Sequence, residues 1–319
     1  MSSAGGEITR KAITDASVRI ANHVRHTPVV TLGSDPGELP HDLTLKLEFL
    51  QPTGSFKVRG AFNLLLSTDV PVQGVIAASG GNFGLAIAYA AHALGIPAHV
   101  FVPDSSPPAK VDRLHRLGAE VSIEPGYYRE ALAASEHHVA RSGGLFAHAY
   151  DHAAVVAGQG TCGRELEEQW PDVDTILVAV GGGGLIGGIA AWYRDGVRIV
   201  AVETEGTPTL FRAREMGRPV DVEVSGVAAS ALGAGRIGSI AWQATQQWVE
   251  DAVLVSDDAV RAAQRQLWEQ ARLLVEPAAA TTLAALVTGA YVPEPGERVC
   301  LLLSGANVDP RSIAAPQIT

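Results

Sequence analysis

Four consecutive glycines, Gly181 to Gly184, follow the apolar run 176–180 and precede a second apolar segment. With Gly187 they give the spacing Gly182-x-Gly184-x-x-Gly187, which is typical of a loop that binds a dinucleotide at the start of a helix. The backbone N–H groups of such a turn bind any phosphate, because they are unpaired donors at the positive end of the helix dipole. The spacing therefore predicts a phosphate site, with NAD as one candidate ligand.

Glu203 bears on the choice between a dinucleotide and another phosphate. It follows Gly182 by 21 positions (203 minus 182) and ends the predicted strand 197–203, where a carboxylate that binds a ribose is expected. Glu203 is also a weak candidate for a metal ligand. Without a second ligand, we expect it to be a carboxylate at a strand end in contact with water.

A lysine lies in an unusual setting near the N-terminus. Lys57 follows Ser55-Phe56 and the turn Pro52-Thr53-Gly54, at the start of a predicted helix. Partial burial and the positive end of the helix lower the pKa of an amine, which favours formation of a Schiff base. Pyridoxal phosphate is the aldehyde cofactor that needs both a lysine and a phosphate site. Lys57 and the glycine run together predict this cofactor.

Two further segments complete a set of four loops, namely Ser79-Gly80-Gly81-Asn82-Phe83-Gly84 and Ser304-Gly305-Ala306-Asn307. In order and spacing the four loops resemble those of the fold-type II pyridoxal-phosphate enzymes, the tryptophan synthase β-subunit-like group. Within that group they resemble the branch of serine/threonine dehydratases and serine racemases. The resemblance extends from residue 8 to residue 309 and explains the glycine motif without NAD.

The resemblance implies a role for each loop. Lys57 would hold the cofactor as a Schiff base and act as the base at Cα, and Phe56 would lie beside the ring. Asn82 would bind the phenolic oxygen, Ser304 would meet the pyridine nitrogen, and Glu276 would lie near the ring. Backbone N–H groups would hold the cofactor phosphate at Gly181, Gly182, Gly183, Gly184 and Leu185. Others would hold the substrate carboxylate at Ser79, Gly80, Gly81, Asn82 and Phe83.

The implied reaction is a β-elimination. A serine hydroxyl at the pyridine nitrogen leaves the ring neutral, and a neutral ring is a weaker electron sink than a protonated one. The resemblance thus implies a dehydratase (ammonia-lyase) that converts a 3-hydroxy amino acid, such as L-threonine or L-serine, to a 2-oxo acid and ammonia.

Three alternatives stay open. In β-replacement enzymes such as cysteine synthase, Asp-Arg typically follows the lysine, whereas Val58-Arg59-Gly60-Ala61 follows Lys57. A 3-hydroxyaspartate dehydratase or racemase is the second alternative. The third is a non-catalytic protein that binds pyridoxal phosphate.

Gly80 and Thr209 are the positions that limit the reaction by resemblance. Racemases of this branch carry a serine two positions before the asparagine, as the acid/base on the face opposite the lysine. That position is Gly80, which has no proton to donate, so we expect racemisation to be weak or absent. Relatives that depend on a metal carry a second carboxylate at the position of Thr209, so no metal is expected.

Composition limits the partners and the compartment. The 319 residues carry a formal net charge of −10, which disfavours nucleic acid and anionic membranes as partners. Only two cysteines occur, Cys162 and Cys300, and no apolar leader precedes the first predicted helix, so a cytoplasmic enzyme is expected. The expected partner is a small amino-acid substrate, and the family resemblance implies a homodimer.

Alternation of strands and helices predicts the architecture that positions these loops. A helix over 8–24 and a strand over 43–50 come first; the repeated strand-turn-helix-strand units are 74–78, 85–94 and 98–102, then 175–180, 186–193 and 197–203. Such alternation predicts an α/β protein with parallel-rich twisted sheets flanked by helices, and ligands at the carboxyl ends of strands.

The resemblance implies the two-lobed tryptophan synthase β-like arrangement of these elements. Residues 1–70 and 148–319 would form a large cofactor-binding domain, and residues 71–147 a small domain inserted in it. Loops 127–129 and 225–238 are expected to select the substrate.

Overall fold

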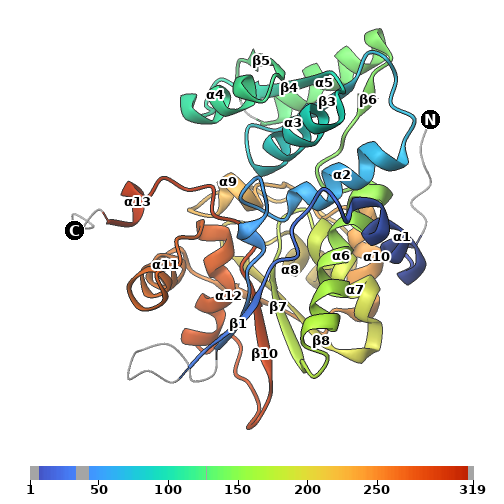
Figure 1. Cartoon of the computed structure of the whole chain (residues 1–319). Helices are drawn as coiled ribbons and strands as arrows, with labels where there is room; N and C mark the ends of the chain where they lie inside the picture. The colour runs from blue at the N-terminus through green and yellow to red at the C-terminus, as the bar shows by residue number, and fades with distance from the viewer. Residues whose placement is uncertain (1–6, 34–42, 127, 315–319) are drawn as a thin grey trace.

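Two β-sheets, one in each lobe, organise the computed structural model, which describes residues 7–33, 43–126 and 128–314 (Figure 1). Within these residues the larger sheet has six strands, in which β1 and β2 pair antiparallel and the other pairs are parallel. Its strands in spatial order are β1 (Val29–Leu32), β2 (Leu43–Lys46), β10 (Val299–Leu302), β7 (Thr175–Ala179), β8 (Arg198–Thr204) and β9 (Asp251–Val255). The smaller sheet is parallel throughout the described residues, in the order β5 (Glu120–Glu124), β4 (Ala98–Pro103), β3 (Val75–Ala78) and β6 (Leu145–Phe146).

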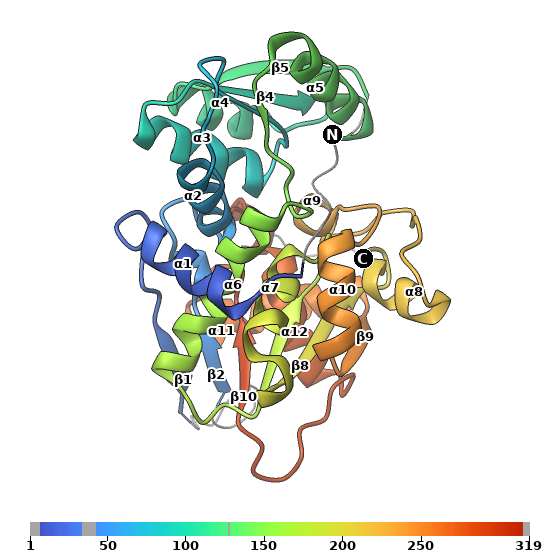
Figure 2. The ribbon, with the colours of Figure 1, turned by 90° about the vertical axis from the view of Figure 1, so that its right-hand side faces the viewer.

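Helices cover both sheets, and the smaller lobe lies above the larger one in two perpendicular views (Figures 1 and 2). No helix in the described part of the chain is long and apolar enough to cross a membrane. The helices are α1 (Arg10–Ile20), α2 (Lys57–Ser67), α3 (Asn82–Leu94), α4 (Pro108–Arg116), α5 (Tyr128–Ser142), α6 (Ala153–Gln169), α7 (Gly184–Tyr193), α8 (Thr209–Met216), α9 (Ala229–Leu232), α10 (Ser239–Trp248), α11 (Asp257–Ala271), α12 (Pro277–Val287) and α13 (Arg311–Ala314).

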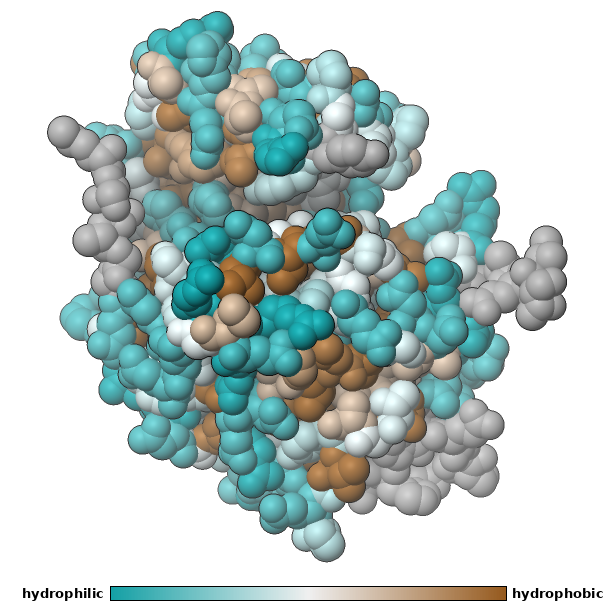
Figure 3. Space-filling model, turned by 180° about the vertical axis from the view of Figure 1, so that it is seen from behind, coloured by the Kyte–Doolittle hydropathy of each residue, from teal (hydrophilic) through white to brown (hydrophobic). Residues whose placement is uncertain are grey.

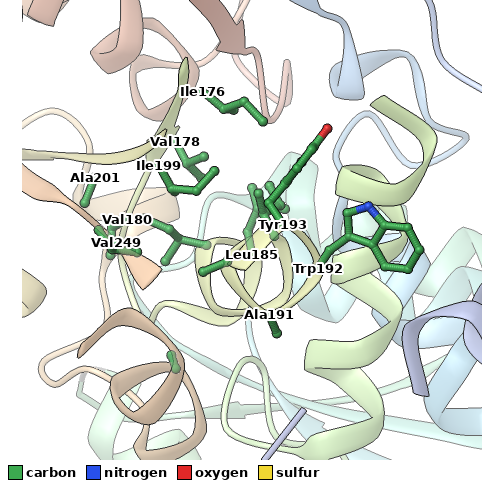
Figure 4. Close-up of a cluster of buried hydrophobic side chains, with 14 of the residues drawn as sticks. Ile176, Val178, Val180, Leu185, Ala191, Trp192, Tyr193, Ile199, Ala201 and Val249 are labelled. Carbon is green, nitrogen blue, oxygen red and sulfur yellow. The ribbon is translucent and has the colours of Figure 1, made fainter. Parts of the chain in front are cut away.

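The core of the larger lobe has two sides, because successive residues of a strand point to opposite faces of a sheet. Ile176 and Val178 of β7 pack against α7 on one face, together with Ile199 of β8 (Figure 4). Leu177 and Val200 point to the other face and join the cluster that includes α11 and α12. Burial on both faces explains the continuous apolar runs seen in the sequence.

The smaller lobe repeats this arrangement around β3. Val75 and Ala77 pack in the cluster that includes α3, whereas Ile76 packs with Phe101 and with Ala131 of α5. The whole sheet lies within residues 75–146, which supports the small domain that we propose for residues 71–147. Polar residues cover much of the back of the molecule, with smaller hydrophobic areas between them (Figure 3).

Most of the expected elements form, with informative differences at their ends. The first helix is shorter than 8–24, and the expected strand 43–50 stops at Lys46, before a 3₁₀ turn over Glu48–Leu50. Helices α3 and α7 begin earlier than predicted, at Asn82 and Gly184. The Gly-rich turns therefore belong to the first helical turns, and their free N–H groups face the ends of the strands.

A buried ion network fixes the start of α2. Arg59 donates from Nε and Nη2 to the two carboxylate oxygens of Glu48, both at 2.7 Å, and from Nη2 to Glu165 of α6 at 2.8 Å. Lys46 of β2 reaches the same Glu165 at 2.5 Å. Burial raises the pKa of Glu48, but Arg59 outweighs this effect and lowers it to about 2. Two cations and two carboxylates thus neutralise each other behind the helix that begins at Lys57.

We expect Arg59→Leu to destabilise the fold by about 3–5 kcal/mol, because Glu48 and Glu165 lose their buried counter-ion. Lys11→Ala is the matched control, since it breaks the exposed Lys11–Asp15 pair and should cost less than about 1 kcal/mol. Urea unfolding followed by circular dichroism measures both changes. Equal losses in the two variants would contradict a structural role for the network.

Candidate functional site

A cavity of about 440 Å³ lies between the two lobes at the carboxyl ends of strands of both sheets. Among its lining residues Lys57 and Lys110 carry positive charge, and none is an aspartate or glutamate. Such a cavity suits an anionic ligand. The lining residues are Lys57, Ala78, Ser79, Gly80, Gly81, Asn82, Phe83, Pro103, Ser105, Ser106, Pro107, Lys110, Tyr128, Ala149, Tyr150, Gly182, Ala229, Ser230, Ala231, Gly233 and Ala234.

Lys57 enters this cavity from the first turn of α2. Its Nζ atom donates to the carbonyl oxygen of Ala149 at 3.1 Å, and lies 5.1 Å from the ring centroid of Phe56 and 5.9 Å from that of Phe83. Burial lowers the pKa of Lys57 to about 8, against the opposing charge of Glu276. A large fraction of the amine is therefore uncharged near neutral pH and is nucleophilic.

Asn82 connects the lobes. Its Nδ2 donates to both carboxylate oxygens of Glu276, at 2.8 and 3.0 Å, while its Oδ1 accepts from Asn307 Nδ2 at 2.8 Å. Arg113 of α4 donates to Asn307 at 2.9 Å. The predicted residues Asn82 and Glu276 thus meet directly, and the C-terminal segment with Asn307 is part of the same network.

The glycine loop at the start of α7 has the form of a phosphate cradle. Gly183 has φ +84°, in the left-handed region, and a side chain there would also collide with Ile237. A Cβ atom on Gly182 would overlap with the ring of Tyr150. Among the hydrogen bonds of the described residues, none is donated by the backbone N–H groups from Gly181 to Leu185. The loop therefore keeps free donors at a helix N-terminus.

Two other predicted loops adjoin this site, with one difference from expectation. Phe56 N–H donates to the carbonyl of Ser304 at 3.1 Å, and Ser304 is buried. In the loop after β3, however, the Ser79 N–H donates to Phe101 at 3.0 Å, and the Gly81 N–H donates to the Ser79 hydroxyl at 3.2 Å. Of the five N–H groups expected to bind a carboxylate, those of Gly80, Asn82 and Phe83 stay free within the described residues.

The expectation that Glu203 contacts water is wrong. Its side chain is buried and accepts hydrogen bonds from Thr209 Oγ1 at 2.9 Å, Leu210 N at 2.9 Å and Phe211 N at 2.7 Å. Burial raises its pKa to about 7, although these hydrogen bonds oppose the shift. Glu203 thus satisfies the free N–H groups at the start of α8, and its oxygens are directed neither at a ribose nor at a metal ion.

Several site residues were missed by reasoning from the sequence. Ser106 and Lys110 reach the cavity from the loop after β4 and the first turn of α4, a region with only generic turn signals. Of the two loops expected to select the substrate, the second supplies α9, which lines the cavity, and the first supplies Tyr128. Tyr127 lies outside the described residues, and Arg129 is exposed beside Glu130.

Comparisons with known proteins agree with this site. A family model described as pyridoxal-phosphate dependent enzyme matches residues 20–305. The L-threonine ammonia-lyase of Geobacter sulfurreducens is 38% identical over 307 residues, covering 95% of this chain and 76% of that protein. The serine racemase of Arabidopsis thaliana is 33% identical, covering 93% and 92%.

Solved structures show the same fold. The maize serine racemase aligns with a TM-score of 0.90 at 30% identity, covering 97% of this chain and 96% of that one. The serine racemase of Dictyostelium discoideum aligns with a TM-score of 0.86 at 30% identity, covering 95% and 99%. A bacterial-type threonine deaminase structure aligns with a TM-score of 0.88 at 32% identity, covering 94% and 99%.

The chain belongs to the family of pyridoxal-phosphate dependent enzymes. The predicted α/β fold, the cofactor and the lyase class are confirmed by these relatives, and NAD is not the ligand of the glycine motif. The site fits the cofactor, because a partly uncharged lysine and a loop with free N–H donors border one cavity that lacks carboxylates.

The lowered pKa of Lys57 gives a testable pH dependence. In cofactor-free protein, acylation of Lys57 by brief pulses of acetic anhydride should increase with pH around a midpoint of about 8, because only the uncharged amine reacts. Glu276→Gln should move the midpoint lower, since it removes a charge that raises this pKa. Peptide mass spectrometry measures both midpoints, and a value near 10.5 in the unmodified chain would contradict the burial argument.

Proposed function

We propose that this lyase removes water from a small 3-hydroxy amino acid, with L-threonine and L-serine as substrates, and releases a 2-oxo acid and ammonia. The observation that carries the proposal is the position of Lys57, whose partly uncharged amine projects into a cavity bordered by two free helix N-termini. One N-terminus suits the cofactor phosphate and the other suits the substrate carboxylate.

The residues assigned to the cofactor are those of the four loops. Lys57 would hold the aldehyde carbon, and the N–H groups from Gly181 to Leu185 the phosphate, with Ser304, Phe56 and Asn82 around the ring. When bound, pyridoxal phosphate withdraws electrons from the Cα atom of the amino acid linked to it. Glu276 anchors the amide of Asn82 and thereby orients it.

Lys57 acts as the base in this proposal. Its amine takes the proton from Cα, and the β-hydroxyl leaves as water after it gains a proton; the enamine released then hydrolyses to the 2-oxo acid and ammonia. A pKa of about 8 suits such a base, since it accepts a proton readily and releases it again near neutral pH. The rings of Phe56 and Phe83 shield the amine from water.

We also propose a cytoplasmic homodimer. Cys162 and Cys300 are buried free thiols, which supports a reducing compartment. The homodimer follows from the family resemblance, and sedimentation equilibrium should give twice the mass of the chain. A mass equal to that of one chain would remove this part of the proposal.

A panel of amino acids tests the proposed reaction. L-Threonine and L-serine should give stoichiometric 2-oxo acid and ammonia, whereas Lys57→Ala should lose at least about 100-fold in rate, because the base is absent. Lactate dehydrogenase-coupled and ammonia assays measure the two products.

Two further outcomes decide between the alternatives. O-acetylserine with sulfide giving cysteine faster than any hydroxy amino acid gives oxo acid would favour the β-replacement enzyme. Full cofactor occupancy with no product from the panel, 3-hydroxyaspartate included, would favour a non-catalytic protein.

A further inference from the structure

We propose that Ser106 supplies the hydroxyl on the substrate face opposite Lys57, and that the enzyme therefore also inverts the configuration of amino acids at Cα. This second activity goes beyond dehydration. It rests on the proposed function in one respect, the removal of the Cα proton by Lys57. It also replaces the expectation, drawn from Gly80 alone, that racemisation is weak or absent.

Gly80 and Ser106 are neighbours because their loops follow adjacent parallel strands. Ala78 at the end of β3 pairs with Phe101 of β4, and the Ser79 N–H continues the ladder to the Phe101 carbonyl at 3.0 Å. A Cβ atom built on Gly80 would overlap with Ser106 Oγ and lie 3.3 Å from Ser106 Cβ. The hydroxyl of Ser106 thus fills the space that a side chain at residue 80 would take.

The Ser106 hydroxyl is available to a ligand. Both Ser106 and Lys57 line the cavity between the lobes. The Ser106 backbone is held by its own N–H bond to the Pro103 carbonyl at 2.9 Å, whereas its hydroxyl takes part in none of the hydrogen bonds found among the described residues. A hydroxyl that is fixed in position and free of partners can donate to a substrate atom.

The two groups reach the cavity from different lobes. Lys57 is held against Ala149 and Phe56 at the start of α2, while Ser106 extends from the small sheet. A substrate whose carboxylate meets the free N–H groups after β3 lies between them. The hydroxyl from the loop after β4 then approaches Cα from the side away from Lys57.

The proton balance of the inversion is closed. The Cα–H bond breaks as the Lys57 amine takes its proton, and a new Cα–H bond forms on the other face with the proton of the Ser106 hydroxyl. Ser106 regains a proton from the Lys57 ammonium through water in the cavity, which restores both groups. No oxidant, reductant or co-substrate is needed, and the reverse sequence converts the D-isomer to the L-isomer.

Moving the hydroxyl between the two loops tests its role. L-Alanine in D₂O is the probe, because it has no β leaving group and is not consumed by elimination. Holoenzyme should form deuterated D-alanine, measured by chiral chromatography and mass spectrometry. Ser106→Ala should lower the rate on the order of 100-fold, and the double variant Gly80→Ser/Ser106→Ala should regain at least about tenfold.

A matched control is Ser105→Ala, which removes the neighbouring hydroxyl of the same loop and should leave the rate of D-alanine formation unchanged. No D-alanine from the unmodified enzyme, or an unchanged rate in Ser106→Ala, would overturn the inference. Oxo acid formation from L-threonine is measured on the same preparations. D-Alanine without oxo acid would sink the dehydratase proposal alone, and oxo acid without D-alanine would sink this inference alone.

Thiol labelling gives a readout that does not depend on turnover. In the holoenzyme of Ser106→Cys, iodoacetamide should alkylate residue 106, while Cys162 and Cys300 are buried. We expect saturating 2-methylserine, which has no Cα proton to lose, to slow this labelling at least about fivefold by covering the thiol. Labelling at the same rate with and without 2-methylserine would show that residue 106 does not face the substrate.

Discussion

The ion pairs of Arg59 are the interaction on which the site depends. Arg59 lies two positions after Lys57 and is clamped by Glu48 and Glu165, so the first turn of α2 has one position relative to the strands and α6. Lys46 balances the second negative charge. A buried network of this kind adds little net stability, but its loss is costly and its geometry is unique. The chain thus holds the base in place by charges that never contact the substrate.

From that fixed lysine the two lobes divide the remaining work. The larger lobe presents the glycine loop at the start of α7, and the smaller lobe presents the loops after β3 and β4. The hydrogen bonds from Asn82 to Glu276 and from Arg113 to Asn307 cross between them. Domain position and cofactor environment are therefore coupled, because the same amide that would meet the cofactor ring also joins the lobes.

The sequence predicted the loops well because each is a local pattern at the end of a regular strand. Lys57, Asn82 and the glycine run needed only spacing and backbone chemistry. Groups brought together by tertiary contacts were not predictable in this way. The burial of Glu203 depends on how α8 folds back onto β8, and the approach of Ser106 to Gly80 depends on the register of β3 and β4. A missing side chain in one loop was thus replaced by a hydroxyl from another.

Borohydride reduction of the purified enzyme is the most direct test of the central claim, that Lys57 holds the cofactor. Reduction fixes the link between a lysine and pyridoxal phosphate, so tryptic mapping identifies the residue. The account predicts a yellow protein that loses its visible absorption on reduction and carries the pyridoxyl group on Lys57. A pyridoxyl group on another lysine, or a protein that stays colourless after incubation with pyridoxal phosphate, would contradict it.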